Sequence, residues 1–303
     1  MEFEDPVVKK VYDIYGSVVN TRKPVRDPKK ILEVLRREYK LIVKPYIVYI
    51  TISAFMNNRP VLFEGPPGTG KTEIGEAILT LWSGKSAFVL PCSENYDEYR
   101  VIGDFHPAIA MVKGFNEESF IPRPLLAALI MDTGVLIDEI RRSSEEFQNM
   151  LLDIIDKRRI VVPELKKVYK QSGTGFQIIF TSNPLDIAQN ELSDAFLRRV
   201  IRIEFRYPSM EEEYNIIKLR LGTLINKLSS EIISKALKIV RELRQKGMYK
   251  PGTADLVSWL TLTALLADAK GKDRAEYIEL CEAGYATLLK NPEDEEIIDE
   301  LLK

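Results

Sequence analysis

Residues 65–72 read Gly65-Pro66-Pro67-Gly68-Thr69-Gly70-Lys71-Thr72, and they fit the phosphate-binding P-loop pattern, a glycine, four residues, then Gly-Lys-Thr. The apolar run Val61-Leu62-Phe63 comes before this loop, and a helical pattern of apolar residues follows it. Glycines let backbone N–H groups wrap around phosphates, and a helix start adds a partial positive charge. The stretch therefore predicts a nucleotide-binding loop between a strand and a helix; a glycine-rich turn without a ligand is the alternative.

The last two residues of the loop have side chains suited to a nucleotide. Lys71 is expected to neutralise the β- and γ-phosphates, since hydrogen bonds to charged groups contribute roughly 1.5–3 kcal/mol each. Thr72 is expected to be a ligand of Mg²⁺. ATP and Mg²⁺ are therefore the cofactors that we expect.

A second motif, which is acidic, follows another short apolar run. Val135-Leu136-Ile137 leads directly into Asp138-Glu139, so that both carboxylates are expected at the tip of a buried strand. This is a Walker B arrangement, in which Asp138 reaches the Mg²⁺ and Glu139 polarises the attacking water. Asp-Glu after a strand is common by itself, and the pairing with a P-loop makes it specific.

A further strand is expected to end at Thr181-Ser182-Asn183-Pro184. Asn183 would lie beside the P-loop strand and could orient the attacking water; a polar turn before Pro184 is the alternative.

Strand and helix patterns alternate through the middle of the chain and then give way to helices alone. This order predicts an α/β core with three αβα layers and a parallel five-stranded sheet, followed by an all-α lid. We expect an N-terminal helical segment over 1–43, the core over 44–207 and the lid over 208–303. Capping boxes are expected at Ser143-x-x-Glu146 and Ser209-x-x-Glu212. The strands are expected at 61–63, 88–90, 135–137, 178–180 and 201–203.

Composition excludes several classes of protein. The 303 residues are 45% apolar and 29% charged with a net charge of −2, which is typical of a globular protein and makes nucleic acid an unlikely partner. Two cysteines and one histidine, His106, exclude a disulfide framework and a two-histidine metal site. No apolar run is long enough for a membrane span and the N-terminus lacks a signal-peptide pattern, so we expect a cytoplasmic protein without a membrane partner.

The ordered motifs resemble those of the AAA+ ATPases, and within them the MoxR-like branch, over about residues 30–270. GPPGTGKT resembles the AAA+ Walker A motif, VLIDEIRR the MoxR-type Walker B region, and FTSNP sensor 1. Residues 192–199, LSDAFLRR, resemble the segment whose arginine reaches the nucleotide of the neighbouring subunit. The resemblance places this arginine finger at Arg199, with Arg198 as the other candidate.

The resemblance also implies assembly and partners. It implies a homo-oligomer, expected to be a hexameric ring, that couples ATP hydrolysis to remodelling or maturation of a client protein, often together with a von Willebrand A-domain protein. Two insertions of the family face the centre of its rings, and they are similar to residues 103–124 and to a hairpin over 161–175. The hairpin carries Lys166, Lys167, Tyr169 and Lys170, and we expect it to grip a partner protein.

Two positions depart from the family pattern. Arg141 stands where the family usually has an asparagine, in Asp-Glu-Ile-Asn-Arg. The region that matches sensor 2, residues 250–255, has no arginine, so Lys250 is the candidate there.

Two other functions stay open from the sequence. One is a nucleic-acid motor such as a McrB-like GTP-using translocase, which a preference for GTP or stimulation by DNA would favour. The other is a nucleotide-gated scaffold with little turnover, which binding without hydrolysis would favour.

Overall fold

The computed structural model describes residues 4–93, 97–184 and 190–303. The chain divides into two compact units. The first comprises residues 1–35, 43–64 and 71–204, and the second comprises residues 36–42, 65–70 and 205–303. The P-loop residues 65–70 are thus grouped with the helical C-terminal part, whereas Lys71 and Thr72 belong to the first unit.

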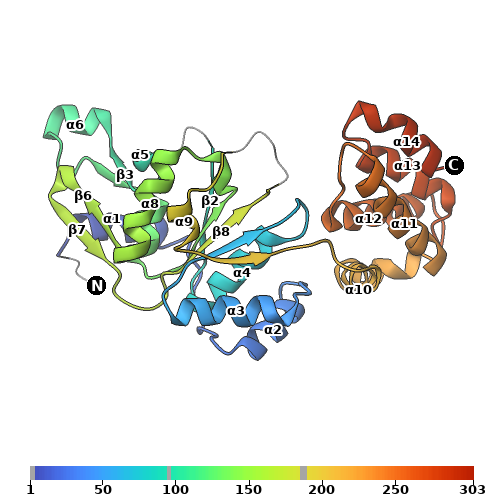
Figure 1. Ribbon diagram of the computed structural model, residues 1–303, viewed down its shortest axis with the longest axis horizontal. Coiled ribbons are helices and arrows are strands. Elements are labelled where there is room, and N and C mark those ends of the chain that lie inside the picture. Colours follow the sequence, from blue (N-terminus) through green and yellow to red (C-terminus); the bar gives the residue numbers. More distant parts are fainter. Residues whose placement is uncertain (1–3, 94–96, 185–189) are drawn as a thin grey trace. The chain divides into compact units, whose positions relative to one another are not determined.

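A five-stranded sheet forms the centre of the first unit, in the order β2-β5-β8-β1-β9 (Figure 1). All four pairings of neighbouring strands are parallel, which confirms the predicted sheet. The strands are β1 (Val61–Glu64), β2 (Phe88–Pro91), β5 (Val135–Asp138), β8 (Ile178–Ser182) and β9 (Ile201–Glu204).

Apolar side chains leave both faces of this sheet, as expected for strands covered on both sides. On one face Leu62, Ile137 and Phe180 join a core with Phe147 and Leu151 of α8 (Glu145–Lys157). On the other face Gly75 of α4 (Lys71–Ser83) lies against Phe63, Leu136 and Ile179; a Cβ at Gly75 would stand 2.7 Å from Leu136 Cδ1. The absence of that Cβ lets α4 approach the sheet closely and completes the three layers.

The N-terminus of α8 is capped by a different serine from the predicted one. Ser144, not Ser143, caps α8: its Oγ accepts from the N–H of Phe147, while the hydroxyl of Ser143 donates to the carbonyl of Ile140. The predicted Ser143–Glu146 capping box is therefore wrong, because the preceding turn uses Ser143 and the cap is the next residue, Ser144.

The other helices that begin in the first unit are α1 (Pro6–Tyr15), α2 (Pro28–Arg37), α3 (Pro45–Met56), α5 (Glu98–Val101), α6 (Pro107–Lys113), α7 (Pro124–Ile130), η1 (Ile140–Arg142), η2 (Pro163–Leu165) and α9 (Asp194–Leu197).

Two antiparallel strand pairs project from the sheet unit. β3 (Gly103–Phe105) pairs with β4 (Phe120–Pro122) around α6, and β6 (Arg159–Val162) pairs with β7 (Lys167–Lys170). The first pair lies within the insertion expected over 103–124, whereas the second spans Arg159–Lys170 and so begins and ends earlier than the hairpin expected over 161–175. His106 is exposed and is the N-cap residue of α6, but its side chain makes no capping hydrogen bond. This agrees with a surface turn residue.

The residues after β9 form only helices (Figure 1). Ser209 and Glu212 make the predicted capping box at the start of α10, and the fully buried Trp259 lies in the core of this bundle. Among the described residues, no helix is long and apolar enough to cross a membrane. The helices are α10 (Met210–Leu221), η3 (Gly222–Lys227), α11 (Ser230–Lys246), α12 (Thr253–Ala269), α13 (Tyr277–Leu288), η4 (Pro292–Asp294) and α14 (Glu295–Leu301).

Candidate nucleotide-binding site

The loop between β1 and α4 has the backbone that its glycines predict. Gly68 and Gly70 have φ angles of 69° and 82°, which residues other than glycine seldom adopt. Thr69 Oγ1 donates to the carbonyl of Pro66 at 2.9 Å and closes the turn internally. Within the second unit the backbone N–H of Thr253 donates to the carbonyl of Gly68 at 3.0 Å. The start of α12 therefore lies directly on the loop.

The sequence placed sensor 2 in this part of α12. Lys250 Nζ donates to the carbonyl of Gln245 at 3.4 Å, and its sensor role stays a prediction. The sequence does not single out Arg244, which lies beside the start of α12. Its Nε donates to the carbonyl of Pro251 at 2.7 Å, and its Nη2 donates to Oε1 of the buried Glu213, also at 2.7 Å. No motif marks Arg244, because it comes from a different helix from the one the family pattern describes.

Lys71 begins α4 and is 8% exposed. Burial lowers the pKa of its ammonium to about 8, although the nearby carboxylates of Asp138 and Glu139 act in the opposite direction. The ammonium has lost part of its hydration to burial, so an added anion stabilises its charged form. Lys71 is therefore electrostatically prepared for a phosphate.

Thr72 and Asp138 meet at the end of β5. Thr72 Oγ1 donates to Asp138 Oδ1 at 2.9 Å, and the hydroxyl of Thr181 on β8 bonds the same carboxylate oxygen. The two predicted Mg²⁺ ligands are thus neighbours. Thr181 belongs to the segment that resembles sensor 1, where the sequence predicts no role for it, and its hydroxyl bonds the same oxygen of Asp138 as Thr72 does.

Glu139 has an unusual backbone for its residue type. Its φ and ψ angles of 53° and 51° are left-handed, and its N–H donates to Thr181 Oγ1 at 2.9 Å. Such conformations are strained in residues other than glycine and persist only where the surroundings hold them. Its carboxylate pairs with Arg142, three residues later. Thr181 therefore supports both acids of the Walker B motif.

The sulfhydryl of Cys92 lies beside these acids, at the end of β2. Its backbone N–H donates to the carbonyl of Asp138 at 2.9 Å. Burial, and then the charges of Asp138 and Glu139, raise the pKa of the thiol to about 12. Cys92 is consequently a neutral, unreactive side chain at physiological pH.

Asn183 directly follows β8, the strand between β5 and β1, and is partly exposed. The sheet order places its backbone beside the end of β1, the strand before the P-loop, as the sequence predicted, and also beside the end of β5. Its role in orienting water stays a prediction.

A buried ionic cluster beside these strand ends was missed. Glu64, the last residue of β1, is 2% exposed and pairs with Arg141 of η1, from Oε1 to Nη2 at 2.9 Å, and with Arg202 of β9. Arg141 Nε also donates to Ser182 Oγ at 2.8 Å. The available signal was a charged residue ending an apolar strand, and an arginine where the family has asparagine.

Comparison with known proteins agrees with this arrangement. Residues 60–200 match the family described as AAA domain (dynein-related subfamily). Gas vesicle ATPase GvpN of Ancylobacter aquaticus is 24% identical over 240 residues, covering 73% of this chain and 65% of GvpN. Residues 60–200 thus match an AAA domain, and the chain is similar to proteins of the MoxR-like AAA+ group.

Two further similarities extend beyond the AAA domain. YehL of Escherichia coli K12 is 26% identical over 249 residues, covering 79% of this chain and 67% of YehL. The chain therefore spans about two thirds of the length of YehL and GvpN. The crystal structure of NtrX from Brucella abortus aligns with a TM-score of 0.58 at 14% identity, over 89% of this chain and 61% of that one, and this likeness concerns the fold alone.

The two candidate finger arginines differ in their surroundings. Arg199 Nε donates to both carboxylate oxygens of Asp156, at 2.9 and 2.8 Å, and Nη1 donates to the carbonyl of Ala195 at 2.9 Å. Arg198 is exposed, and the described residues give its guanidinium no hydrogen bond or ion pair. Within the described part of the chain, Arg198 is thus the one of the two arginines whose guanidinium is not engaged.

The hairpin expected to grip a partner is only partly available. Lys167 Nζ lies 2.7 Å from a carboxylate oxygen of Asp5 and 2.5 Å from one of Glu117. Tyr169 is 7% exposed. Lys166 and Lys170 are exposed. Lys167 therefore holds the hairpin to the N-cap residue of α1 and to the other insertion, and Tyr169 is buried.

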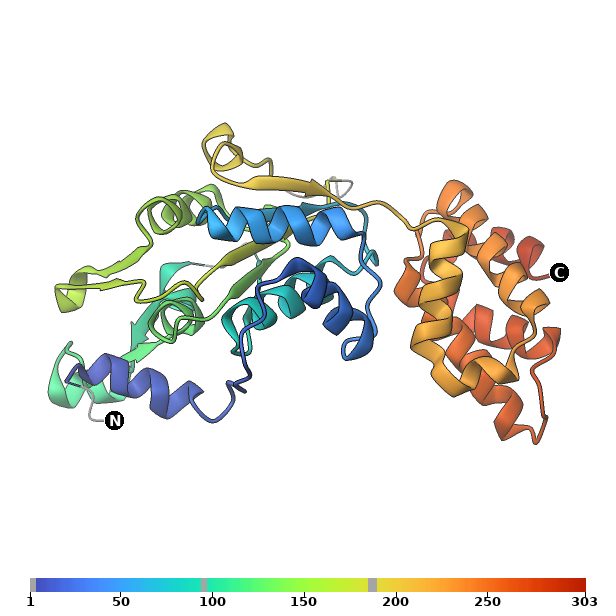
Figure 2. The same ribbon diagram turned by 90° about the horizontal axis from the view of Figure 1, so that it is seen from below.

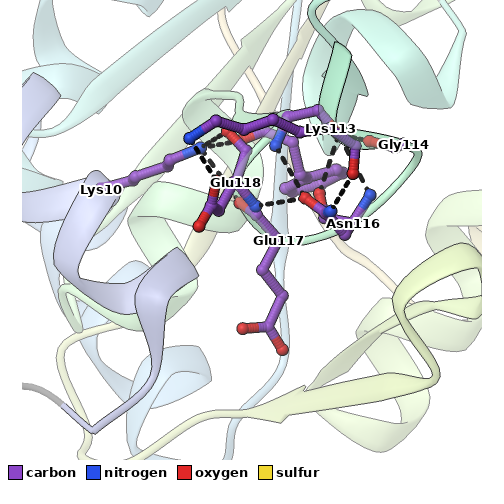
Figure 3. Close-up of polar contacts among 8 residues, drawn as sticks. Lys10, Lys113, Gly114, Asn116, Glu117 and Glu118 are labelled. Carbon is purple, nitrogen blue, oxygen red and sulfur yellow. Dashed lines mark hydrogen bonds and ion pairs between the residues drawn. The ribbon is translucent and has the colours of Figure 1, made fainter. Parts of the chain in front are cut away.

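The other insertion is also tied to the N-terminal helix (Figures 2 and 3). Lys10 of α1 directs its ammonium at the carbonyls of Glu117 and Phe120, each at 3.0 Å, and at that of Glu118. Asn116 closes the preceding turn by accepting from the N–H of Glu118 at 2.9 Å. The loop after α6 is therefore anchored by Lys10 of α1, in addition to the ion pair between Lys167 and Glu117.

The donor set suits Mg²⁺ better than a metal with a full set of protein ligands. Thr72 and Asp138 supply hard oxygen atoms, and the described residues contain no cluster of three His, Cys, Asp or Glu side chains able to hold a metal. Mg²⁺ typically uses one or two protein oxygens together with phosphates and water. The residues present fit a nucleotide-bound Mg²⁺.

Proposed function

We propose that this chain is a Mg²⁺-dependent ATP hydrolase that assembles into a ring and uses turnover to remodel a client protein. The hydrogen bond of 2.9 Å between Thr72 and Asp138 carries the proposal. It joins the helix that follows the P-loop to the strand that ends in the Walker B acids. A phosphate-binding loop alone would support binding only; Glu139, directly beside this pair, adds a base for hydrolysis.

Each side chain has a defined task in this proposal. Lys71 places its ammonium against the terminal phosphates, and Glu139 accepts a proton from the attacking water. Asn183 holds that water in line. When bound, Mg²⁺ would neutralise charge on the phosphate oxygens, held by Thr72 and Asp138.

Ring formation and a client follow from the family and from two exposed surfaces. AAA+ proteins typically form rings, and Arg198 is free to reach a neighbouring subunit. Met111, Val112 and Phe115 are 88%, 84% and 75% exposed on the insertion that carries α6. Apolar side chains displayed in this way support contact with a client protein, and a von Willebrand A-domain protein is a partner to test.

The test is the solution mass of Glu139→Gln with and without ATP and Mg²⁺, together with the ATP turnover of the unmodified chain. Glu139→Gln should bind ATP without cleaving it and shift to a ring of about six chains, as in the related AAA+ rings. Glu145→Gln, at an exposed position of α8, is the matched control and should turn over ATP normally. Nucleotide binding without any turnover by the unmodified chain would refute the hydrolase, and a single-chain mass in every state would refute the ring.

A further inference from the structure

The buried carboxylate of Glu64 lies at a critical point of the chain. Glu64 is the residue before Gly65, where β1 passes into the P-loop, and its side chain is 3% exposed. A buried carboxylate is stable only when paired and hydrogen-bonded. Whatever pairs with Glu64 therefore also fixes the end of the strand from which the P-loop departs.

Arg141 makes more than an ion pair with this carboxylate. Its Nη2 lies 2.9 Å from Glu64 Oε1, while its Nε donates to Ser182 Oγ at 2.8 Å. Glu64 and Ser182 are themselves register partners of the parallel strands β1 and β8. The planar guanidinium thus bridges the ends of two adjacent strands, a geometry that a lysine ammonium cannot reproduce.

Each of these three residues adjoins a candidate catalytic element. Glu64 precedes the P-loop, Ser182 precedes Asn183, and Arg141 lies two residues after Glu139. Arg141 belongs to η1, the turn that follows the left-handed backbone of Glu139. One side chain therefore connects the turn that follows Glu139 to the ends of the adjacent strands β1 and β8.

We propose that Arg141 is a positioning residue for hydrolysis, which fixes the Glu139 turn to β1 and β8 by bridging Glu64 and Ser182. The inference rests on the proposed ATP hydrolysis and adds a residue to it. The nucleotide itself needs the P-loop and Lys71, which Arg141 does not contact. Loss of the bridge should therefore affect turnover more than nucleotide binding.

Arg202 provides the matched comparison. It pairs with the other oxygen of Glu64, but its side chain is 60% exposed and comes from β9, on the far side of β1 from β8. Arg141→Lys and Arg202→Lys are the same exchange against the same carboxylate. Only the first removes a bridge to Ser182 and to the Glu139 turn.

The experiment measures kcat and KM for ATP with Mg²⁺, and the thermal midpoint, for the unmodified chain and both variants. Arg141→Lys should lower kcat by at least about tenfold with KM within about threefold, whereas Arg202→Lys should keep kcat within about twofold. Equal losses in the two variants, or an unchanged kcat in Arg141→Lys, would overturn the positioning role. An inactive unmodified chain would refute the proposed hydrolase and this inference with it.

A second variant keeps the test decisive if Arg141→Lys folds poorly. Ser182→Ala removes the other end of the bridge without touching a charge, and it should also lower kcat with little change in KM. If the bridge acts as one unit, Arg141→Lys combined with Ser182→Ala loses little more than Arg141→Lys alone. Multiplying losses would mean that the two residues act separately, which contradicts the proposal.

Discussion

Arg199 is bound to Asp156 through both carboxylate oxygens, whereas Arg198 beside it is exposed with its guanidinium unpaired among the described residues. The side chain of Arg199 is 34% exposed and that of Asp156 43%, so the pair lies at the surface. An arginine that acts on a neighbouring nucleotide must be free to leave its own chain. Arg198 meets this condition without breaking an existing pair.

We expect Arg198→Ala to lower ATP turnover by roughly 10³–10⁵ while ATP binding stays close to normal, since an arginine finger acts mainly on the transition state. Arg199→Ala should have the smaller effect on turnover and should lower the thermal midpoint slightly through loss of a surface ion pair. Steady-state turnover and ATP titrations of both variants make the comparison.

Mixing subunits shows whether the arginine acts across a boundary. Arg198→Ala chains retain their own P-loop, and Lys71→Ala chains retain Arg198 but should not bind nucleotide. Neither is expected to be active alone, and an equimolar mixture should recover turnover. If instead Arg199→Ala is inactive alone and recovers turnover when mixed with Lys71→Ala, whereas Arg198→Ala stays active alone, Arg199 is the finger and its pair with Asp156 opens on assembly.

The lowered pKa of Lys71 predicts a proton taken up on nucleotide binding. In the free chain burial places this pKa at about 8, and a bound triphosphate stabilises the ammonium and raises the pKa. ATP affinity should therefore fall as the pH rises through about 8, and binding at about pH 8.5 should absorb protons. Isothermal titration in two buffers of different ionisation enthalpy measures the uptake.

Lys71→Arg is the control for this titration, because a guanidinium stays charged throughout the range. Its binding should show no proton uptake from this site. The same shift has a sign for stability: between about pH 8 and pH 10.5 the unfolded chain holds a proton that the folded chain has lost. This group therefore adds stability as the pH rises through that window.

Thr181 supports both Walker B acids, which makes its hydroxyl a target separate from the acids themselves. Thr181→Val keeps the shape but removes the bonds to the Asp138 carboxylate and the Glu139 N–H. Turnover should fall by about 10–100-fold, as for other residues that orient metal ligands. Thr181→Ser retains the hydroxyl and should restore most of the activity; equal losses in both variants would indicate a packing effect.

The sequence predicted the strands, the acids and the P-loop because local signals determine each of them. Apolar runs define buried strands, and the GPPGTGKT spacing is rarely produced by any other site. The Glu64–Arg141–Ser182 cluster could not be predicted in this way. Its members are 77 and 41 residues from one another along the chain, and only the sheet order brings them together.

The sequence also could not predict which charged side chains form ion pairs. Lys166, Lys167 and Lys170 are indistinguishable as letters, yet Lys167 pairs with Asp5, 162 residues away. The distinction between Arg198 and Arg199 depends on which direction a short helix turns each side chain. Adjacent identical residues acquire different roles only in three dimensions.

Lys10 supplies the last prediction, since one side chain anchors the loop that follows α6 (Figure 3). Lys10→Met removes an ammonium that donates to three carbonyls and retains much of the apolar stem. A hydrogen bond to a charged group contributes roughly 1.5–3 kcal/mol, so local opening of residues 116–120 should increase by about ten- to a hundredfold. Lys9→Met, at an exposed position of the same helix, is the control. Amide hydrogen exchange followed peptide by peptide measures the opening: faster exchange at 116–120 in Lys10→Met alone is expected, and equal exchange in both variants would show that the loop holds its own shape.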